Sequence, residues 1–407
     1  MSDNQVNVLE VSPQVKWIGS LDFDLVTFDV VMETKYGSTY NSYYIDAEKK
    51  TIIETVKEKK FPEFLAKIQS LTDVSEIEYI VMNHTEPDHS GSLKELLKLA
   101  PKAQVVGSGN AIRYLEDIVG QPFRFIKVKD GDTLDLGNKT LRFIAAPNLH
   151  WPDSMYTYLE DDQLLFTCDS FGAHYAHPAM FDDLVGEWDD SFQYYFEVIL
   201  RPFSKFMLKA IEKIRPLEIK AICPGHGPIL RTHWKKYVDL SEQYAREYLE
   251  SSGSNEMRVF IPYVSAYGYT AEMANSIKKG IESVGDLEVE VMDIEHVPLG
   301  EMDASLTKAH GVIVGSPTIN QNILLPIYKL FSAVNPLRDK GKLAGAFGSY
   351  GWSGEGVKLI EENLKNLKLE VFQQGIAAKF RPDEAMQERL FIFGKSFGKK
   401  LLEKQLA

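Results

Sequence analysis

The stretch IEYIVMNHTEPDHSG, residues 77–91, determines how the first part of this chain is interpreted. Its apolar run at 77–82 is typical of a buried strand. The next residues place two histidines and two carboxylates within six positions, namely His84, Glu86, Asp88 and His89. An unpaired charge is costly beside a buried strand. We therefore expect these four side chains to converge from a turn onto a shared partner.

Other apolar runs end in the same kinds of residue. His150 follows residues 145–149, Asp169 ends LLFTCD, and His226 lies in AICPGHGP. Proline or glycine comes within a few residues of each, which indicates loops at strand ends. A lone histidine in such a loop is more often structural than metal-binding. Four histidines and three carboxylates together, however, exceed what one metal would use.

The remaining histidines do not stand beside other candidate ligands at strand ends. His174 and His177 form an HxxH in GAHYAHPAM, but no carboxylate accompanies them and their flanks are typical of a surface loop. His233, His296 and His310 have no convergent neighbours in the sequence. We leave all five out of the expected ligand set.

Length and charge limit the possible classes of protein. With 407 residues, 44% of them hydrophobic, the chain is long enough for two domains of about 100 to 200 residues each. The small polar residues around Gly253 mark a boundary between 1–253 and 254–407. A net charge of −13 argues against nucleic acid or an anionic membrane as the main partner. No apolar run approaches the roughly 18 residues of a membrane span, and the first residues do not resemble a signal peptide, so we expect a cytoplasmic protein.

The two parts differ in their pattern of elements. The first has strand-like runs with few helical stretches, which predicts a layered α/β fold with much antiparallel strand. The second alternates strands and helices, which predicts a doubly wound parallel sheet. Its expected strands are residues 258–264, 287–294, 311–317, 342–349 and 369–380.

Three loops of the second part follow expected strands. VSAYGYTAEM offers Ser265, Gly268 and Thr270 before a helix, where backbone N–H groups and hydroxyls bind phosphate. GSPTINQNI and GSYGWSGEG follow the third and fourth strands. Ligands of open α/β sheets bind at this edge. Neither a GxGxxG nor a GxxxxGKS motif occurs in its required context, which counts against a Rossmann dinucleotide fold or an NTPase.

The pattern HxExDH at 84–89, with His150, Asp169 and His226, resembles the metallo-β-lactamase superfamily, whose hydrolases carry HxHxDH and bind zinc. Glu86 departs from that pattern, and mixed carboxylate and imidazole ligation favours iron over zinc. With LHWPDSM and a flavodoxin-like second half, the chain resembles the flavodiiron proteins of anaerobes. This resemblance implies a metallo-β-lactamase-like αββα sandwich followed by a flavodoxin-like doubly wound sheet.

The resemblance also implies roles for particular residues. One iron would be held by His84, Glu86 and His150, the other by Asp88, His89 and His226, with Asp169 as the bridge. His89 is the ligand that some members of the family are thought to lack. Tyr195, in SFQYYFEVIL, matches a tyrosine that hydrogen-bonds the bound substrate, although a core aromatic residue fits the pattern equally well.

FMN is the flavin that the resemblance implies. Tyr350 and Trp352 would lie near its isoalloxazine ring, unless they only pack the loop. The expected FMN-binding residues form three segments: Ser265, Ala266, Tyr267, Gly268, Tyr269 and Thr270; Ser316, Pro317, Thr318, Ile319 and Asn320; and Ser349, Tyr350, Gly351, Trp352, Ser353 and Gly354.

The implied activity is reduction of dioxygen to water, of nitric oxide to nitrous oxide, or of both, as protection of an anaerobe against oxygen and nitrosative stress. The two cysteines, Cys168 and Cys223, lie far apart in apolar runs. The chain therefore lacks the CxxC pairs of a fused rubredoxin. Electrons would come from a separate donor, either rubredoxin or a reduced deazaflavin coenzyme. The resemblance further implies a head-to-tail homodimer, with a dimer of dimers as an alternative.

Two other functions remain open at this point. A zinc hydrolase fused to a flavodoxin would explain the fold but not Glu86. A pure flavin electron carrier would leave seven convergent side chains unused. Metal analysis distinguishes these readings, because they predict zinc, FMN alone, or iron with FMN.

Overall fold

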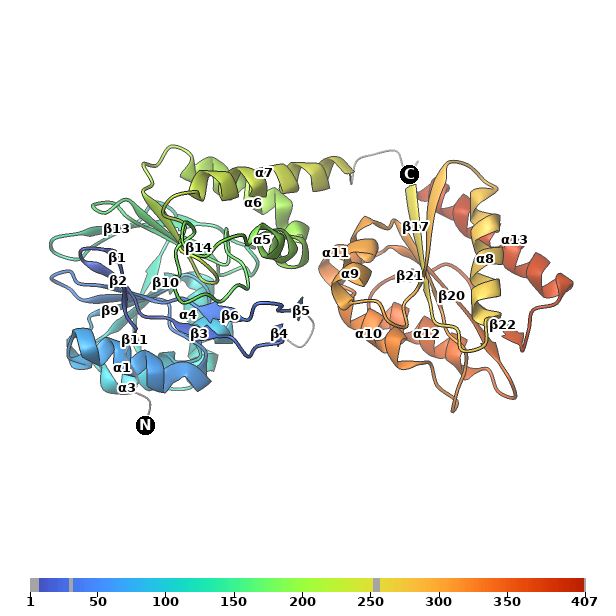
Figure 1. Ribbon diagram of the computed structural model, residues 1–407, viewed down its shortest axis with the longest axis horizontal. Coiled ribbons are helices and arrows are strands. Elements are labelled where there is room, and N and C mark those ends of the chain that lie inside the picture. The colour runs from blue at the N-terminus through green and yellow to red at the C-terminus, as the bar shows by residue number, and fades with distance from the viewer. Residues whose placement is uncertain (1–6, 29–31, 252–256, 406–407) are drawn as a thin grey trace. The chain divides into compact units, whose positions relative to one another are not determined.

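The computed structural model describes residues 7–28, 32–251 and 257–405, which divide into two compact units (Figure 1). Among these residues, one unit comprises 7–28 and 34–249, and the other comprises 32–33, 250–251 and 257–405. The boundary that the sequence analysis places at Gly253 lies outside the described residues.

Two sheets form the centre of the first unit. The larger has seven strands in the order β1 (Leu9–Ser12), β2 (Val15–Trp17), β7 (Tyr43–Ile45), β8 (Thr51–Ile53), β9 (Tyr79–Met82), β10 (Gln104–Ser108) and β11 (Arg124–Val128). The smaller has five, in the order β12 (Thr133–Asp135), β13 (Thr140–Ala145), β14 (Met155–Leu159), β15 (Leu164–Cys168) and β16 (Ala221–Pro224). Short strands β3 (Ser20–Asp22) and β6 (Ser38–Tyr40) pair with each other, and β4 covers Thr27–Phe28.

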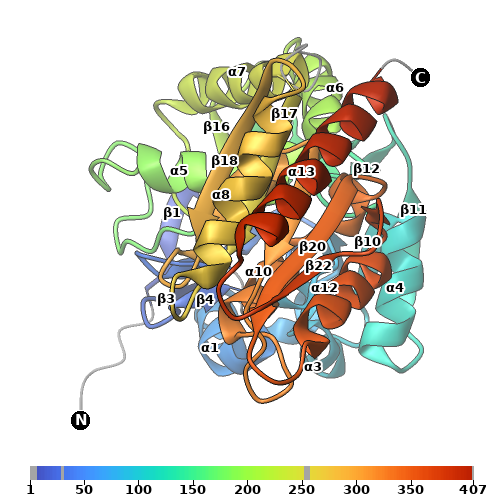
Figure 2. The ribbon, with the colours of Figure 1, turned by 90° about the vertical axis from the view of Figure 1, so that its right-hand side faces the viewer.

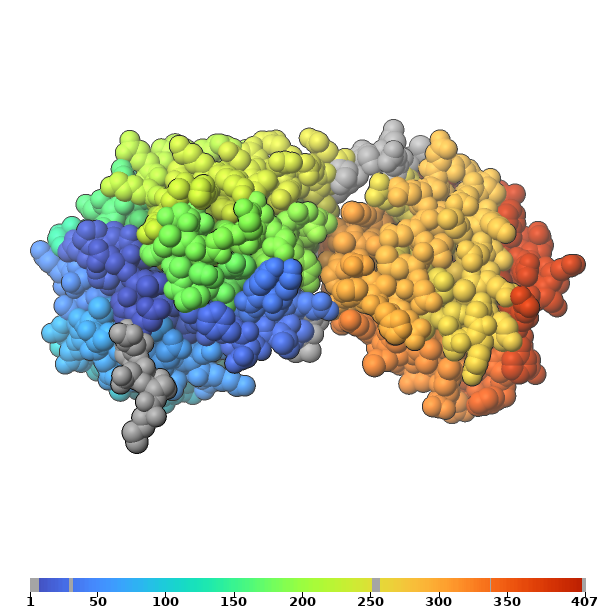
Figure 3. All heavy atoms as spheres, in the orientation of Figure 1, coloured from blue at the N-terminus to red at the C-terminus, as the bar shows by residue number. Residues whose placement is uncertain are grey.

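The main core of this unit lies between its two sheets. Val81 and Val106 of the larger sheet belong to the same buried cluster as Phe143 and Phe166 of the smaller sheet. Helices cover the outer sides: α1 (Phe61–Leu71) and α3 (Leu93–Leu99) on one, and α6 (Ser204–Ile214) and α7 (Trp234–Ser251) on the other (Figure 1). α7 forms part of the outer surface (Figure 3). The expected αββα sandwich is confirmed.

The second unit is built on one parallel sheet. Its order is β18 (Leu287–Asp293), β17 (Met257–Tyr263), β19 (Gly311–Gly315), β20 (Leu343–Tyr350) and β21 (Glu370–Val371), and β22 (Ile376–Lys379) also pairs with β20. α8 (Tyr269–Glu282) and α13 (Glu384–Gln405) lie side by side on one face (Figure 2). The opposite face is covered by α9 (Leu299–Lys308), α10 (Leu325–Ala333) and α12 (Glu355–Asn366). The doubly wound parallel sheet is therefore also confirmed.

Two local expectations were wrong. The single strand expected at 369–380 is divided into β21 and β22. A Cβ at Gly375, between the two pieces, would collide with the carbonyl oxygen of Ala346 in β20, so the chain passes too close to its neighbour to continue as a regular strand. The turn expected after Asn83 contains a one-turn helix, α2 (Pro87–Ser90), for which proline at the first position is favourable.

Among the described residues, no helix is long and apolar enough to cross a membrane.

Candidate functional site

Four segments of the first unit bring the seven expected ligands together. The loop after β9 and the start of α2 carry four of them, and the loop between β13 and β14 carries His150. Asp169 directly follows β15, and His226 lies two residues beyond β16. All seven are buried or nearly so. Side chains that are distant in sequence thus meet because parallel and adjacent strands end at one edge of their sheets.

The first group contains His84, Glu86, His150 and Asp169, whose ligand atoms all lie within 4.8 Å of one another. Glu86 Oε2 is 3.2 Å from His84 Nε2 and 3.0 Å from His150 Nε2. Asp169 Oδ2 lies 3.5 Å and 3.3 Å from the same two nitrogens. Two imidazoles and two carboxylates therefore surround one point.

The second group contains Asp88, His89 and His226. Asp88 Oδ2 is 3.0 Å from His226 Nε2 and 3.5 Å from His89 Nε2. The other oxygen of Asp169, Oδ1, lies 3.0 Å from His89 Nε2 and 3.6 Å from His226 Nε2. This group has the same composition as the first once Asp169 is included.

Asp169 thus faces both groups, one oxygen to each. Two metals in one site are typically about 3.5–4 Å apart and need a bridging anion. A carboxylate whose two oxygens point at two equal sets of nitrogen and oxygen donors has the arrangement that such a bridge requires.

Hydrogen bonds from outside the cluster orient two of the histidines. His226 Nδ1 is 2.5 Å from the carbonyl oxygen of Thr39. A carbonyl only accepts, so Nδ1 carries the proton and Nε2 is left as a free donor atom for a metal. His84 Nδ1 lies 3.2 Å from Asp153 Oδ2. That oxygen also accepts from the backbone N–H and the hydroxyl of Thr85.

The cluster has the charge distribution of a cation site. Among the described residues, neither oxygen of Asp88 has a hydrogen-bond partner, although the side chain is only 4% exposed. Burial alone would keep the histidines neutral. Hydrogen bonds donated by the His84 ring to Asp153 and Glu86 nevertheless hold the pKa of His84 well above its usual range, and Asp169 and Glu86 raise the pKa of His150 to about 9. Protons therefore balance the carboxylates here, and a bound metal ion would displace them. The mixed nitrogen and oxygen donors fit iron.

His174, which the sequence pattern places in a surface loop, is instead buried against the cluster. Its ring centroid is 4.7 Å from that of His226 and 5.0 Å from that of Tyr195. Its Nδ1 lies 2.7 Å from Ser38 Oγ. Burial and the neighbouring His226 lower its pKa well below the usual range, so it is neutral. The HxxH motif gave no sign of this, because the contacts come from Ser38, 136 positions away.

Tyr195 lies at the end of α5 (Asp189–Tyr195) and is 2% exposed. Its ring centroid is 6.2 Å from that of His226. Burial raises the pKa of its hydroxyl well above the usual range, so the hydroxyl keeps its proton and can donate a hydrogen bond. The side chain therefore packs beside the cluster as well as in the core.

Two further residues at the cluster, Glu54 and Cys168, belong to no sequence motif. Glu54 is buried behind His89 and burial raises its pKa to about 8. Burial also raises the pKa of the Cys168 thiol well above its usual range, so the thiol stays protonated, and Sγ lies 3.9 Å from Asp169 Oδ1. Cys168 is therefore a weak hydrogen-bond donor to Asp169.

The three expected flavin loops lie at the carboxyl edge of the sheet of the second unit. The first contains Gly268, whose φ of 84° is left-handed and which directly precedes α8. Thr270 Oγ1 is 2.9 Å from Ser349 Oγ, which joins the first loop to the third. The backbone N–H of Thr318 donates to the carbonyl oxygen of Ser349, which joins the second loop to the third. The hydrogen bonds make one continuous site from three segments.

The surface of these loops fits a flavin phosphate and ring. A Cβ at Gly268 would meet no atom within 4 Å, so the N-terminus of α8 opens onto free space where a phosphate is favoured. Tyr267 and Trp352 are 82% and 84% exposed. Large aromatic side chains left this exposed beside a phosphate-type loop provide stacking surface for a planar ligand.

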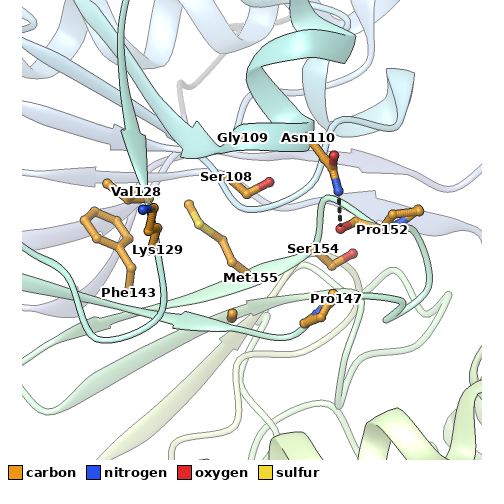
Figure 4. Close-up of a pocket in the computed structure, with 11 residues that line it drawn as sticks. Ser108, Gly109, Asn110, Val128, Lys129, Phe143, Pro147, Pro152, Ser154 and Met155 are labelled. Carbon is orange, nitrogen blue, oxygen red and sulfur yellow. Dashed lines mark hydrogen bonds between the residues drawn. The ribbon is translucent and has the colours of Figure 1, made fainter.

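A cavity of about 260 Å³ lies behind the His150 loop and holds none of the seven ligands. It is lined by residues of α4 (Gly109–Val119), β11, β13 and the 147–155 loop (Figure 4). At its rim, the amide of Asn110 donates to the carbonyl of Pro152 (Figure 4). The hydroxyl of Ser108 donates to the carbonyl of Asp153. These bonds hold the loop that carries His150 and Asp153, so residues at the rim of the cavity support the site.

Comparison with known proteins assigns both units. Residues 39–227 match the ODP family of β-lactamases, and residues 261–394 match flavodoxin. The chain is 39% identical to the flavo-diiron protein FprA2 of Clostridium acetobutylicum over 97% of its own length and 99% of that protein. The chain belongs to the flavodiiron protein family.

Two further relatives have names that state an activity. A nitric oxide reductase of Moorella thermoacetica is 32% identical, covering 97% of this chain and 98% of that protein. The solved structure of rubredoxin oxygen:oxidoreductase from the anaerobe Desulfovibrio gigas is 29% identical, with a TM-score of 0.74, covering 98% and 100% of the two chains. This flavodiiron protein is therefore an oxidoreductase whose cofactors are FMN and a diiron centre.

Proposed function

We propose that this flavodiiron protein reduces dioxygen to water with electrons from a separate donor in the cytoplasm, and that nitric oxide, reduced to nitrous oxide, is its alternative substrate. The observation that carries the proposal is the carboxylate of Asp169, whose two oxygens face two equal sets of donors. A site for a pair of irons in the same chain as a flavin site supports chemistry that needs several electrons at one place.

The residues of the chain have distinct tasks in this scheme. His84, Glu86 and His150 would hold one iron, Asp88, His89 and His226 the other, and Asp169 both. When bound, FMN and the irons supply the electrons and the binding positions for the gas. Dioxygen needs four electrons and four protons to give two waters, and two molecules of nitric oxide need two of each to give nitrous oxide and one water.

Residues around the cluster would orient the ligands and the substrate. The carbonyl of Thr39 fixes the ring of His226, and Asp153 fixes that of His84. The hydroxyl of Tyr195 would donate a hydrogen bond to the substrate, because it is buried beside His226 and keeps its proton. Phosphate would bind at Ser265, Gly268 and Thr270, with Tyr350 and Trp352 beside the flavin ring.

Metal and flavin analysis, followed by anaerobic turnover, tests this function. We expect roughly two irons and one FMN per chain, and consumption of dioxygen by the protein supplied with reduced rubredoxin. The same donor with nitric oxide measures the alternative activity, and a reduced deazaflavin tests the other class of donor. Zinc without gas consumption would indicate a hydrolase, and FMN alone would indicate an electron carrier. Either result would refute the proposal.

A further inference from the structure

Glu54 occupies an unusual position directly after β8. Its side chain is 2% exposed, and its φ of 59° lies in the left-handed region, which residues other than glycine seldom adopt. Both backbone polar groups are held: the N–H donates to the carbonyl of Val81 and the carbonyl accepts from the hydroxyl of Ser42. Strained backbone of this kind is often kept for a functional reason.

Only half of the Glu54 carboxylate is used by the surrounding protein. Oε1 accepts the backbone N–H of Asn83 at 2.6 Å. Oε2 is buried and has no hydrogen-bond partner among the described residues. Burying a carboxylate oxygen without a hydrogen-bond partner costs free energy. We therefore expect a hydrogen-bond donor at this atom.

Among the described residues, His89 lacks a hydrogen-bond acceptor where Glu54 lacks a donor. Its Nε2 faces Asp169 Oδ1 and Asp88 Oδ2 at 3.0 Å and 3.5 Å. Its Nδ1 is buried and, within the described part of the chain, has no hydrogen-bond partner. A carboxylate oxygen of Glu54, a ring nitrogen of His89 and Cys168 Sγ all lie within 4.8 Å of one another. An imidazole that binds a metal through Nε2 carries its proton on Nδ1, and such a proton almost always has an acceptor.

The backbone of the same segment already fixes His89. Both the backbone N–H and the hydroxyl of Thr55, the residue after Glu54, donate to the carbonyl oxygen of His89, at 2.9 Å and 2.5 Å. On the other side, a Cβ at Gly225 would lie only 2.8 Å from Cε1 of the His89 ring. The ring is therefore confined between Gly225 and the Glu54 segment, with little freedom to turn away.

From these contacts we infer that Glu54 is the positioning residue of His89. In the iron-bound protein, the cations favour the ionised carboxylate of Glu54, and its Oε2 accepts the proton of His89 Nδ1 and so holds Nε2 on the second iron. This inference rests on the proposed function, because it presupposes a diiron centre. It makes His89 a ligand in this chain, and it gives Asp88, His89, His226 and Asp169 the same two-nitrogen, two-oxygen composition as the first group.

The substitution Glu54→Gln tests the inference with little change of shape. If the amide oxygen keeps the bond from Asn83, the amide NH₂ replaces Oε2 and sets a donor against the Nδ1 proton. Loss of a group that orients a metal-bound histidine typically weakens metal binding by about 10–100-fold. We expect a chelator to remove one of the two irons from the reduced holoprotein faster by that factor, while the second iron and the FMN are retained.

Three comparisons separate positioning from damage to the fold. Thr55→Val removes one bond to the His89 carbonyl but leaves Glu54, so it should release iron far more slowly than Glu54→Gln. Mössbauer spectra of isotopically enriched protein should show one altered iron in Glu54→Gln and one unchanged. In a His89→Ala background, Glu54→Gln should have no additional effect, because its target is gone.

Unchanged iron release and spectra in Glu54→Gln would overturn the inference, as would an equal effect of the substitution with and without His89. Failure of the proposed function looks different. In that case the unsubstituted protein itself would lack iron or would consume neither gas.

Discussion

At the scale of single residues, Asp169 combines burial, a negative charge and a strained neighbouring backbone in the metal site. It directly follows Cys168, whose φ of 46° is left-handed, and is itself 2% exposed. The nearby histidines overcome the effect of burial and hold the pKa of Asp169 well below its usual range. The carboxylate is therefore charged, and its two oxygens face the two groups of donors. A strained bend that aims a buried charge in this way agrees with a bridging role.

Replacing Asp169 with Asn should empty the metal site without affecting the flavin. The amide removes a negative charge shared by two cations, so the variant should hold at most one iron per chain and lose at least about 100-fold in gas consumption. FMN content should be unchanged, since its loops lie in the other unit. Asp182→Asn is the matched control, because Asp182 is a buried carboxylate outside the ligand cluster that accepts the backbone N–H groups of Arg231 and His233 and lies near His233 Nδ1. Full iron content and turnover in Asp169→Asn would defeat the assignment.

His310 should make the stability of the second unit depend on pH. Partial burial, with Lys342 and Arg258 nearby, lowers the pKa of its ring, and its Nδ1 accepts the backbone N–H of Arg258. The unfolded chain therefore binds a proton at higher pH than the folded one. Stability is complete above the ordinary histidine pKa of about 6.5 and falls as pH drops below it.

The comparison with His310→Asn isolates this effect. Asn can still accept from Arg258 but does not titrate. Urea unfolding followed by FMN fluorescence between about pH 7 and pH 5 should show a smaller loss of stability in the variant than in the parent. Equal pH dependence of the two proteins would show that His310 is not responsible.

How far the sequence predicts the site depends on the kind of residue. His84, His150 and His226 stand out because a strand end, a charge and a proline or glycine occur within a few positions. Glu54 and His174 lie in no such local sequence pattern. Their roles arise from contacts with His89 and Ser38, 35 and 136 positions away, and no local pattern encodes a contact between segments so far apart in the sequence.

At the scale of elements, long and strongly patterned segments were predicted well. The strands later found as β9, β17, β18 and β20 were expected close to their observed bounds. Strands of only two or three residues, such as β3 and β6, are too short for a periodic pattern. The split between β21 and β22 was missed because it depends on how closely Gly375 approaches β20.

The contact between α8 and α13 should tolerate no side chain at Gly280. A Cβ there would collide with the carbonyl oxygen of Phe391, and one at Gly394 with that of Ile277. Alanine raises helix propensity by about 1 kcal/mol, but overpacking against backbone costs about 1–3 kcal/mol or more. We expect Gly280→Ala to destabilise the second unit by about 1–2 kcal/mol in urea unfolding.

Gly109→Ala is the control for this substitution. Gly109 begins α4, and a Cβ there would meet nothing within 4 Å. It should be neutral or slightly stabilising. A stable Gly280→Ala would mean that the two helices can move apart at little cost.

At the scale of the whole molecule, each unit holds one half of the proposed chemistry. The first unit carries the seven candidate iron ligands and the second carries the three flavin loops. The candidate residues of each site all belong to one unit. Transfer of electrons between the two nevertheless requires them to lie close together, and the chain can satisfy this requirement either within one molecule or between two.

We expect the second arrangement, a head-to-tail homodimer in which each flavin serves the diiron centre of the partner subunit, because one two-fold axis creates both pairs at once. Mixing two inactive variants tests it. Asp169→Asn lacks the metal site, and Thr270→Asp places a carboxylate at the N-terminus of α8, where we propose that phosphate binds. After subunit exchange, a heterodimer has one intact metal site opposite one intact flavin, so activity should partly return. If demonstrated heterodimers stay inactive, electrons pass within one chain and the cross-subunit path is wrong.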